Sequence, residues 1–363
     1  MECLSQWPEP VHRVQCISES GVEAIPDRYV KPPSQRPAPQ ELADAGISIP
    51  LVDLSGLDDE SRRASTLREI SDACREWGFF QAINHGVPDD LLDRMREVWR
   101  GFFHLPLEEK QVYANNPKTY EGYGSRLGVE KGAILDWGDY FFLLLLPSHV
   151  KDSNKWPALP ENCRDTIDEY SKRVQALCGR LLKAMSISLG LREDFLKDAF
   201  GGEVSACLRV NYYPKCPQPD LTLALSSHSD PGGMTVLLAD DKVKGLQVRK
   251  DDKWVTIAPY PHSFIVNVGD QIQVISNGIF KSVEHRVVAN SGRERISAAF
   301  FCNPKTDVPI GPAPDLVSNE RPARYVSMTF DEYRLFIRQV GPRGKCQVES
   351  LKKRPTLDKV DGP

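Results

Sequence analysis

The second half of the chain, from Ser205 onward, is built of short segments rich in β-branched and aromatic residues. Turn signals such as DD, PG, GD, NG and NSG separate these segments. Closely spaced short strands with such turns between them are typical of an antiparallel sandwich or barrel. We therefore expect a mainly β core, either a sandwich or a barrel of antiparallel strands. The expected strands are CLRVNYYP, LALSSHSD, MTVLLA, LQVRK, KWVTIA, SFIVNV, QIQVIS, VEHRVVA and RISAAFF.

The first half of the chain has a helical pattern, with apolar residues recurring at helical spacing over about 58–77, 88–103 and 161–188. Two short strands, ISIPLVDLSG and FFQAINHG, lie among these helices, and a capping box at TFDE opens a last helix that ends near residue 340. We predict four regions. They are a proline-rich N-terminal arm at 1–42, a mostly helical region at 43–204 that contributes strands to the core, the β core at 205–310, and a C-terminal helix and tail at 311–363.

Charge and hydropathy exclude several classes of partner. The formal net charge is -4, which provides no basic field for nucleic acid or an anionic membrane. The longest apolar run, YFFLLLL, is far shorter than a membrane span. The nine cysteines are scattered without a CxxC pair, and the N-terminus lacks a secretory signal. We expect a reducing, cytoplasmic location, with the nucleus also open to the chain.

The segment HSDPGGMT contains a candidate metal clamp. His228 and Asp230 lie two residues apart on an expected strand, so both side chains point to one face. A metal needs a third ligand, and His285 is the histidine that lies within a later strand of the β region. Two imidazoles and one carboxylate, with positions left open, suit non-haem Fe(II) better than structural zinc. The alternative is a turn in which the aspartate accepts backbone hydrogen bonds.

A cation follows the third candidate ligand at close range. VEHRVVANSGRERISAAFF predicts a hairpin around 290–292, in which His285 faces Ser297 and Arg295 is a diagonal neighbour roughly 7 to 8 Å away. That separation suits a five-carbon diacid held between a metal and a guanidinium, with the Ser297 hydroxyl as a second donor. The alternative for Arg295 is a surface arginine beside a turn.

The strand CLRVNYYP, which precedes the clamp, places four chemically active side chains on one face: Cys207, Arg209, Asn211 and Tyr213. If this face turns inward, Asn211 and Tyr213 supply polar contacts near a cofactor. Arg209 then becomes a buried cation that needs a partner. The partner could be a core carboxylate or an anionic substrate.

These motifs together resemble the plant Fe(II)/2-oxoglutarate-dependent dioxygenase family, which includes anthocyanidin synthase and flavonol synthase. The resemblance covers roughly residues 47–340 and includes IPLVDLSG, WGFFQAINHGV, NYYP, HSD, His285 and RIS. It implies a double-stranded β-helix, or jelly-roll, core flanked by helices. It also implies catalytic Fe(II) on His228, Asp230 and His285, O2 as oxidant and ascorbate as activator. The co-substrate 2-oxoglutarate would chelate the iron and meet Arg295 and Ser297, with Tyr213 and Asn211 assisting.

Within this family the chain is most similar to the jasmonate-induced oxygenases, through IPDRYVKP, RVNYYPKCPQPDLTLALSSHSDPGGMTVLL and MTFDEYRLFIRQVGPRGK. The similarity implies hydroxylation of jasmonic acid to 12-hydroxyjasmonic acid, coupled to decarboxylation of 2-oxoglutarate to succinate and CO2, which would down-regulate jasmonate signalling. The main alternative is flavonoid oxidation, as by anthocyanidin synthase or flavonol synthase. Against it, Asn303 stands where anthocyanidin synthase has a glutamate. A non-catalytic binding module and a zinc hydrolase are further alternatives.

The last expected helix supplies candidate substrate contacts. Phe330, Tyr333 and Arg334 recur at helical spacing and share a face. Arg334 on this face is either a snorkelling or ion-paired arginine or a ligand for an anion. If the helix closes the barrel mouth, Arg209 and Arg334 can hold one carboxylate. Phe301, which continues the face of Arg295 and Ser297, would then bracket a small apolar body together with Phe330.

Overall fold

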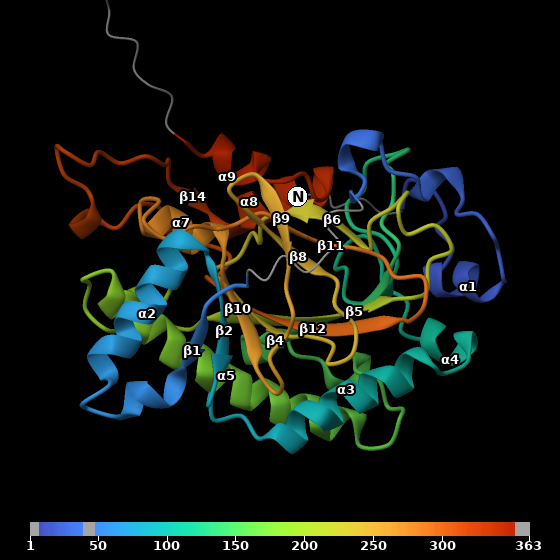
Figure 1. The fold of residues 1–363 in the computed structure, drawn as a ribbon, viewed down its shortest axis with the longest axis horizontal. Coiled ribbons are helices and arrows are strands. Elements are labelled where there is room, and N and C mark those ends of the chain that lie inside the picture. Colours follow the sequence, from blue (N-terminus) through green and yellow to red (C-terminus); the bar gives the residue numbers. More distant parts are fainter. Residues whose placement is uncertain (1–6, 39–47, 353–363) are drawn as a thin grey trace, which may run out of the picture.

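The computed structural model describes residues 7–38 and 48–352, and its centre is a pair of β-sheets (Figure 1). The major sheet has eight strands in the order β1-β2-β10-β7-β12-β5-β4-β3, and the minor sheet has four in the order β6-β11-β8-β9. A cavity lies between the sheets, since residues of both line it. This arrangement confirms the predicted double-stranded β-helix core with flanking helices.

The strands of the major sheet are β1 (Leu51–Asp53), β2 (Phe79–Ile83), β3 (Gly122–Gly124), β4 (Asp139–Leu146), β5 (Ser205–Tyr213), β7 (Met234–Leu238), β10 (Phe264–Val268) and β12 (Arg295–Asn303). Those of the minor sheet are β6 (Leu225–His228), β8 (Leu246–Lys250), β9 (Lys253–Thr256) and β11 (His285–Val287). A third, two-stranded sheet joins β13 (Pro309–Ile310) and β14 (Met328–Thr329).

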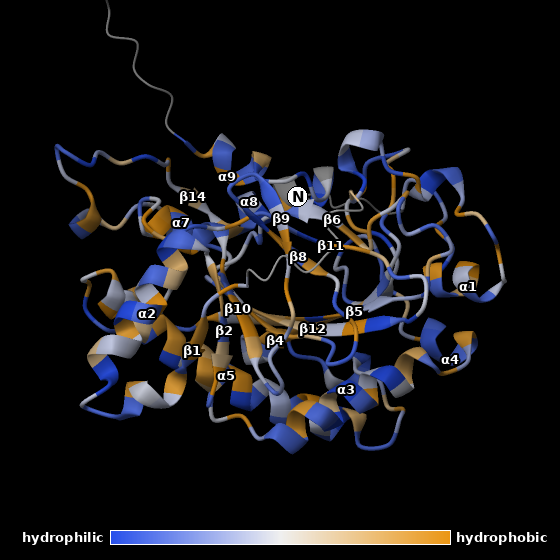
Figure 2. Cartoon of the chain, viewed as in Figure 1, coloured by the Kyte–Doolittle hydropathy of each residue, from blue (hydrophilic) through white to orange (hydrophobic). Residues whose placement is uncertain are grey.

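Three long helices cover the major sheet on the side away from the minor sheet (Figure 1). They are α2 (Arg63–Glu76), α3 (Asp89–Phe103) and α5 (Cys163–Ser188), within a few residues of the predicted helices. Hydrophobic residues concentrate where these helices meet the sheet (Figure 2). The shorter helices are α1 (Val14–Glu19), α4 (Leu107–Gln111), α6 (Phe195–Ala199), α7 (Asp270–Ile275), α8 (Phe330–Val340) and α9 (Cys346–Ser350). Turns of 3-10 helix occur at Asp27–Tyr29, Pro33–Gln35, Leu54–Asp58, Ser148–Val150, Ser153–Lys155 and Pro314–Leu316. None of the described helices is both long and apolar enough to cross a membrane.

Two local predictions in the β region are wrong. The segment QIQVIS lies in and directly after α7 instead of a strand. Its alternation is too short to separate a strand from a helix, and the residues of α7 are buried on every side. The hairpin expected around 290–292 does not form either. β11 pairs with β6 and β8, whereas β12 pairs with β5 and β7, so the two segments belong to different sheets. In a double-stranded β-helix, consecutive strands can lie in different sheets, because the chain crosses from one sheet to the other. In a hairpin, consecutive strands pair with each other.

The described part of the N-terminal arm lies against the start of β4. Backbone N–H groups of Val14 and Gln15 donate to the two carboxylate oxygens of Asp139, each at 2.9 Å. Tyr29 is buried and packs edge-to-face on Trp137. Residues 1–6 and 39–42 of the predicted arm lie outside the described residues.

Trp99 on α3 offers a test of the helix packing. Its side chain is fully buried and contacts the rings of Phe102, Phe103 and Phe141. Replacing it by alanine leaves a cavity, so Trp99→Ala should lower the free energy of unfolding by about 3–5 kcal/mol, measured by urea denaturation. The exposed neighbour Glu97 is the control, and Glu97→Ala should cost less than about 0.5 kcal/mol. Equal effects of the two substitutions would contradict this packing.

Candidate metal centre and its cavity

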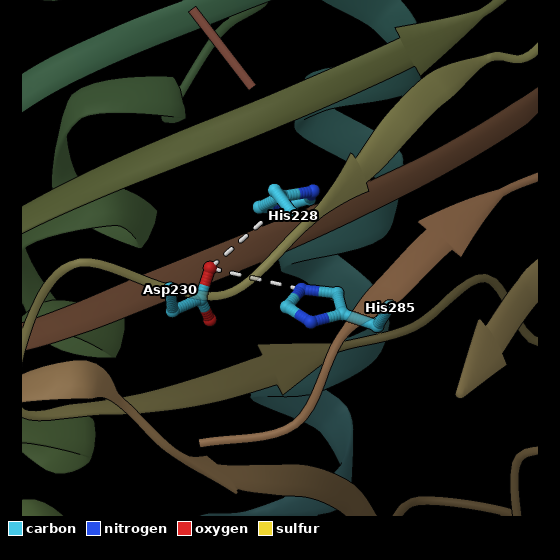
Figure 3. A group of neighbouring side chains, drawn as sticks. All are labelled: His228, Asp230 and His285. Atoms are coloured by element: carbon cyan, nitrogen blue, oxygen red, sulfur yellow. Dashed lines mark ion pairs between the residues drawn. The ribbon is translucent and has the colours of Figure 1, made fainter. Parts of the chain in front are cut away.

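The minor sheet brings together the three predicted metal ligands, His228, Asp230 and His285. His285 begins β11 and is the direct cross-strand partner of His228, the last residue of β6. Asp230 lies two residues after His228. Its Oδ1 lies 3.6 Å from His228 Nε2 and 3.7 Å from His285 Nε2 (Figure 3). We refer to these three residues as the triad.

Hydrogen bonds behind the triad fix which atoms face its centre. His228 Nδ1 lies 2.8 Å from the Ser226 carbonyl, and His285 Nδ1 lies 3.1 Å from the Val283 carbonyl. Each Nδ1–H therefore donates to the backbone, which leaves the Nε2 lone pair for a metal. The second carboxylate oxygen of Asp230 accepts from Thr235 Oγ1 at 2.5 Å and from Asn267 Nδ2 at 2.8 Å. Oδ1 then remains for the ion.

The charges within the triad also suit a divalent cation. Burial would raise the pKa of Asp230, but the neighbouring His285 and His228 lower it below its usual value, so the carboxylate is ionised. Burial and the nearby His228 lower the pKa of His285 to about 4, so this imidazole is neutral. Burial alone would lower the pKa of His228, but the neighbouring Asp230 carboxylate raises it. A bound metal would take the place of that proton.

The donor set fits ferrous iron. Its ligand atoms all lie within 4.8 Å of one another, and in the described part of the chain no fourth His, Cys, Asp or Glu joins the group. A site limited to two imidazoles and one carboxylate leaves coordination positions open, whereas structural zinc sites are closed by four protein ligands. The residues therefore fit a reactive iron site.

A cavity of about 280 Å³ opens beside the triad and contains all the predicted co-substrate residues. Arg295 on β12 is directly opposite Tyr213 on β5, and Ser297 is opposite Asn211. Arg295 is 3% exposed, and its Nη1 donates to Ser297 Oγ at 3.3 Å. Its Nε finds no partner among the described residues. A buried guanidinium with an unpaired N–H is well suited to receive a carboxylate.

The predicted substrate residues line the same cavity. Arg209 lies over the ring of Tyr140 at 3.9 Å, and its Nε donates to Asn211 Oδ1 at 2.6 Å. Burial lowers the pKa of Arg209, and no carboxylate in the described residues forms an ion pair with it. Arg334 on α8 pairs with Asp331 at 2.7 Å, but its buried Nε has no partner in the described part of the chain. Phe301 on β12 and Phe330 on α8 supply apolar walls.

Four residues with clear roles were missed by the sequence analysis: Thr235, Asn267, Tyr140 and Arg338. Thr235 and Asn267 hold Asp230, and their strands show no signal that distinguishes them from other buried polar positions. Tyr140 was hidden in an apolar run. Arg338 lies one helical turn after Arg334, lines the cavity and donates to the carbonyls of Lys118 and Thr119. Arg338 lies four residues after Arg334, and residues at this spacing share a helix face, so the sequence could have indicated that both arginines face the cavity.

Two family models match the chain. Residues 204–304 match the 2OG-Fe(II) oxygenase superfamily, and residues 49–159 match the N-terminal region described as a non-haem dioxygenase in morphine synthesis. Among curated relatives, jasmonate-induced oxygenase 2 of Arabidopsis thaliana is 59% identical over 96% of this chain and 94% of its own length. Flavanone 3-dioxygenase 2 of Oryza sativa subsp. japonica is 41% identical over 88% of this chain and 92% of its own length.

Solved structures give the same relationship. The crystal structure of JOX2 in complex with 2OG, Fe and JA matches with a TM-score of 0.90 and 58% identity, covering 96% of this chain and 100% of that one. A rice dioxygenase for auxin oxidation matches with a TM-score of 0.72 and 28% identity, covering 84% of this chain and 100% of that one. The similarity therefore extends over both the helical region and the β core.

Removing the triad carboxylate tests the metal centre directly. Asp230→Ala leaves two uncharged donors, so the affinity for Fe(II) or Mn(II) should fall at least about 100-fold and turnover should be lost. The metal should raise the unfolding temperature of the wild type, measured anaerobically, and leave that of Asp230→Ala unchanged. The exposed Asp90 provides the control variant Asp90→Ala, which should bind metal normally. Stabilisation of Asp230→Ala by metal would contradict the assignment.

Proposed function

The chain belongs to the 2OG-Fe(II) oxygenase superfamily, and from this premise we propose that it hydroxylates jasmonic acid to 12-hydroxyjasmonic acid. It is an oxygenase that uses Fe(II), 2-oxoglutarate and O2, with ascorbate as an activator. Its substrate is a small carboxylic acid. Hydroxylation would remove the active hormone and so down-regulate jasmonate signalling.

The triad and the Arg295 guanidinium have separate roles in the proposed reaction. Bound Fe(II) supplies the activation of O2 that couples decarboxylation of 2-oxoglutarate, to succinate and CO2, with hydroxylation of the substrate. His228, Asp230 and His285 hold the metal. Arg295 and Ser297 would receive the far carboxylate of 2-oxoglutarate, since Arg295 is a buried cation of the cavity wall that has no carboxylate partner among the described residues and donates to Ser297. Tyr213 and Asn211 flank this position on β5.

One observation carries the choice of substrate: two arginines, Arg209 and Arg334, converge on the cavity that begins at the triad. Arg209 forms no ion pair with a carboxylate of the described residues, and removing a cation from water without a counter-charge is costly; the carboxylate of a bound substrate would remove this cost. Arg334 already pairs with Asp331, and its buried Nε remains to donate to the same carboxylate. Arg338 adds a third positive charge along the same wall. The apolar body of the acid would lie between Phe301 and Phe330, whose rings also keep water away from the reacting carbon.

A flavonoid substrate fits this cavity less well. Flavonoids are uncharged polyphenols, so they would leave Arg209 without a counter-ion and would require several hydroxyl partners. The 41% identity to a flavanone dioxygenase reflects the common fold and iron chemistry. The arginines therefore favour an acid over a flavonoid.

A product assay tests the function. The purified chain is incubated in air with iron, ascorbate, 2-oxoglutarate and either jasmonic acid or a flavonoid panel. We expect jasmonic acid to gain one oxygen atom at C12, with succinate formed in equal amount, as measured by mass spectrometry. Oxidation of a flavonoid with no change in the acid would overturn the proposal.

The two arginines should recognise charge. Arg209→Ala and Arg334→Ala each remove a charge-assisted hydrogen bond, so kcat/KM for jasmonic acid should fall about 10- to 100-fold. The methyl ester lacks the negative charge and should be affected much less. Arg192→Ala, at an exposed position outside the cavity, is the control. Equal losses of kcat/KM for the acid and for the ester would show that these arginines do not bind the substrate carboxylate.

Arg295 should govern the co-substrate alone. Arg295→Leu removes the guanidinium expected to bind the far carboxylate, so KM for 2-oxoglutarate should rise about 10- to 100-fold. Arg295→Lys keeps the positive charge but loses the planar guanidinium, so its KM for 2-oxoglutarate should lie between those of the wild type and Arg295→Leu. The measurement is succinate formation at varied 2-oxoglutarate and saturating substrate. An unchanged KM for 2-oxoglutarate would place its carboxylate elsewhere.

A further inference from the structure

Asn303 is a buried amide in the cavity that neither the metal, the co-substrate nor the substrate carboxylate engages. It ends β12 on the same face as Phe301 and is 8% exposed. It lies beside the loop that follows Asp230, because a Cβ on Gly232 would collide with Asn303 Oδ1. Its amide is therefore close to the place where oxidation occurs.

Half of this amide lacks a protein partner. Asn303 Nδ2 lies 3.8 Å from Cys207 Sγ, while Oδ1 is buried without a hydrogen bond among the described residues. Leaving a buried amide unpaired costs about 1–3 kcal/mol, so native proteins rarely do so without a reason. Because Asn303 is one of the residues that line the cavity, a molecule bound there can complete the hydrogen bonds of this amide.

The neighbouring thiol decides which end of the amide is free. Burial raises the pKa of Cys207 to about 12, so the thiol keeps its proton and is a donor. The nitrogen and oxygen of an amide have nearly the same shape, and a half turn brings Oδ1 onto the thiol. An S–H group donating to a carbonyl oxygen is a better match than an N–H group donating to sulfur. The N–H2 group of Asn303 is then the free end.

We propose that the Asn303 amide N–H donates a hydrogen bond to a carbonyl oxygen on the body of the substrate, making the chain selective for keto acids. This inference rests on the proposed function, since jasmonic acid carries a ring ketone in addition to its carboxylate. The arginines read only the carboxylate. Asn303 is thus the residue that distinguishes one small carboxylic acid from another of the same shape.

The experiment compares jasmonic acid with its analogue that lacks the ring ketone. For the wild type, kcat/KM should be about 10-fold or more higher for the keto acid, because the analogue leaves the Asn303 donor buried and unpaired. Asn303→Ala should lower kcat/KM for the keto acid about 10-fold and for the deoxo acid less than about 2-fold. Asn303→Asp, which offers acceptors only, should penalise the keto acid further. The exposed Asn154→Ala is the matched control and should retain the wild-type preference.

Cys207 acts as a positioning residue and provides an independent readout. Cys207→Ser keeps a donor for the amide oxygen and should preserve the preference for the keto acid. Cys207→Ala removes the donor and should reduce that preference. Thermal unfolding of each variant verifies that it is folded, and the wild-type ratio of the two acids requires no variant at all.

The outcomes separate this inference from the proposed function. A wild-type ratio near one, or equal losses on both acids in Asn303→Ala, would overturn the role of Asn303 while the oxidation of jasmonic acid still stands. Wild-type enzyme that oxidises neither acid would overturn the proposed function itself.

Discussion

A buried carboxylate held between two sheets is the interaction on which the rest of the site depends. Asp230 faces the two histidines of the minor sheet with one oxygen, and with the other it accepts hydrogen bonds from Thr235 on β7 and Asn267 on β10 of the major sheet. A buried ionised group is costly unless it is paired and hydrogen-bonded, and a metal ion would complete that pairing. The same contacts therefore join the sheets and pre-form the iron site.

The pairing of β12 with β5 sets the order of the other functional side chains along the cavity. Alternate residues of β12, from Arg295 to Asn303, line the cavity, and alternate residues of β5 lie opposite them. Side chains on one face of a strand are separated by about 7 Å, so each pair of positions supplies one more function along the row. The row leads from the co-substrate anchor at Arg295 to the aromatic wall at Phe301. The partner row on β5 places Arg209 between these two ends.

The sequence predicted the parts of this design that follow from local periodicity. The expected alternation along a strand brought His228 and Asp230 together correctly, although β6 ends at His228 and Asp230 lies beyond it. The same alternation grouped Arg209, Asn211 and Tyr213 correctly. The helices followed from their apolar spacing. The prediction failed where pairing is non-local. β11 and β12 were expected to form a hairpin, yet Arg295 reaches the same cavity as His285 from the other sheet, because the two sheets face each other. When the chain crosses to the other sheet, the alternation along each strand still decides which side chains face the cavity. It does not decide which strand pairs with which.

Some roles in the cavity depend on which polar atoms lack a partner after folding, and no sequence pattern records this. Asn303 was noticed as a departure from a related enzyme, but only the fold brings its amide to Cys207 and Gly232. In addition to this amide, the cavity presents Nε donors on Arg295 and Arg334 that have no partner among the described residues. Charge on arginine selects acids as a class, since the carboxylate contact is similar for every one of them. Discrimination within the class needs a neutral group at a fixed distance from the iron, and an amide anchored by a neighbouring thiol meets that requirement without adding a second charge to a dry cavity.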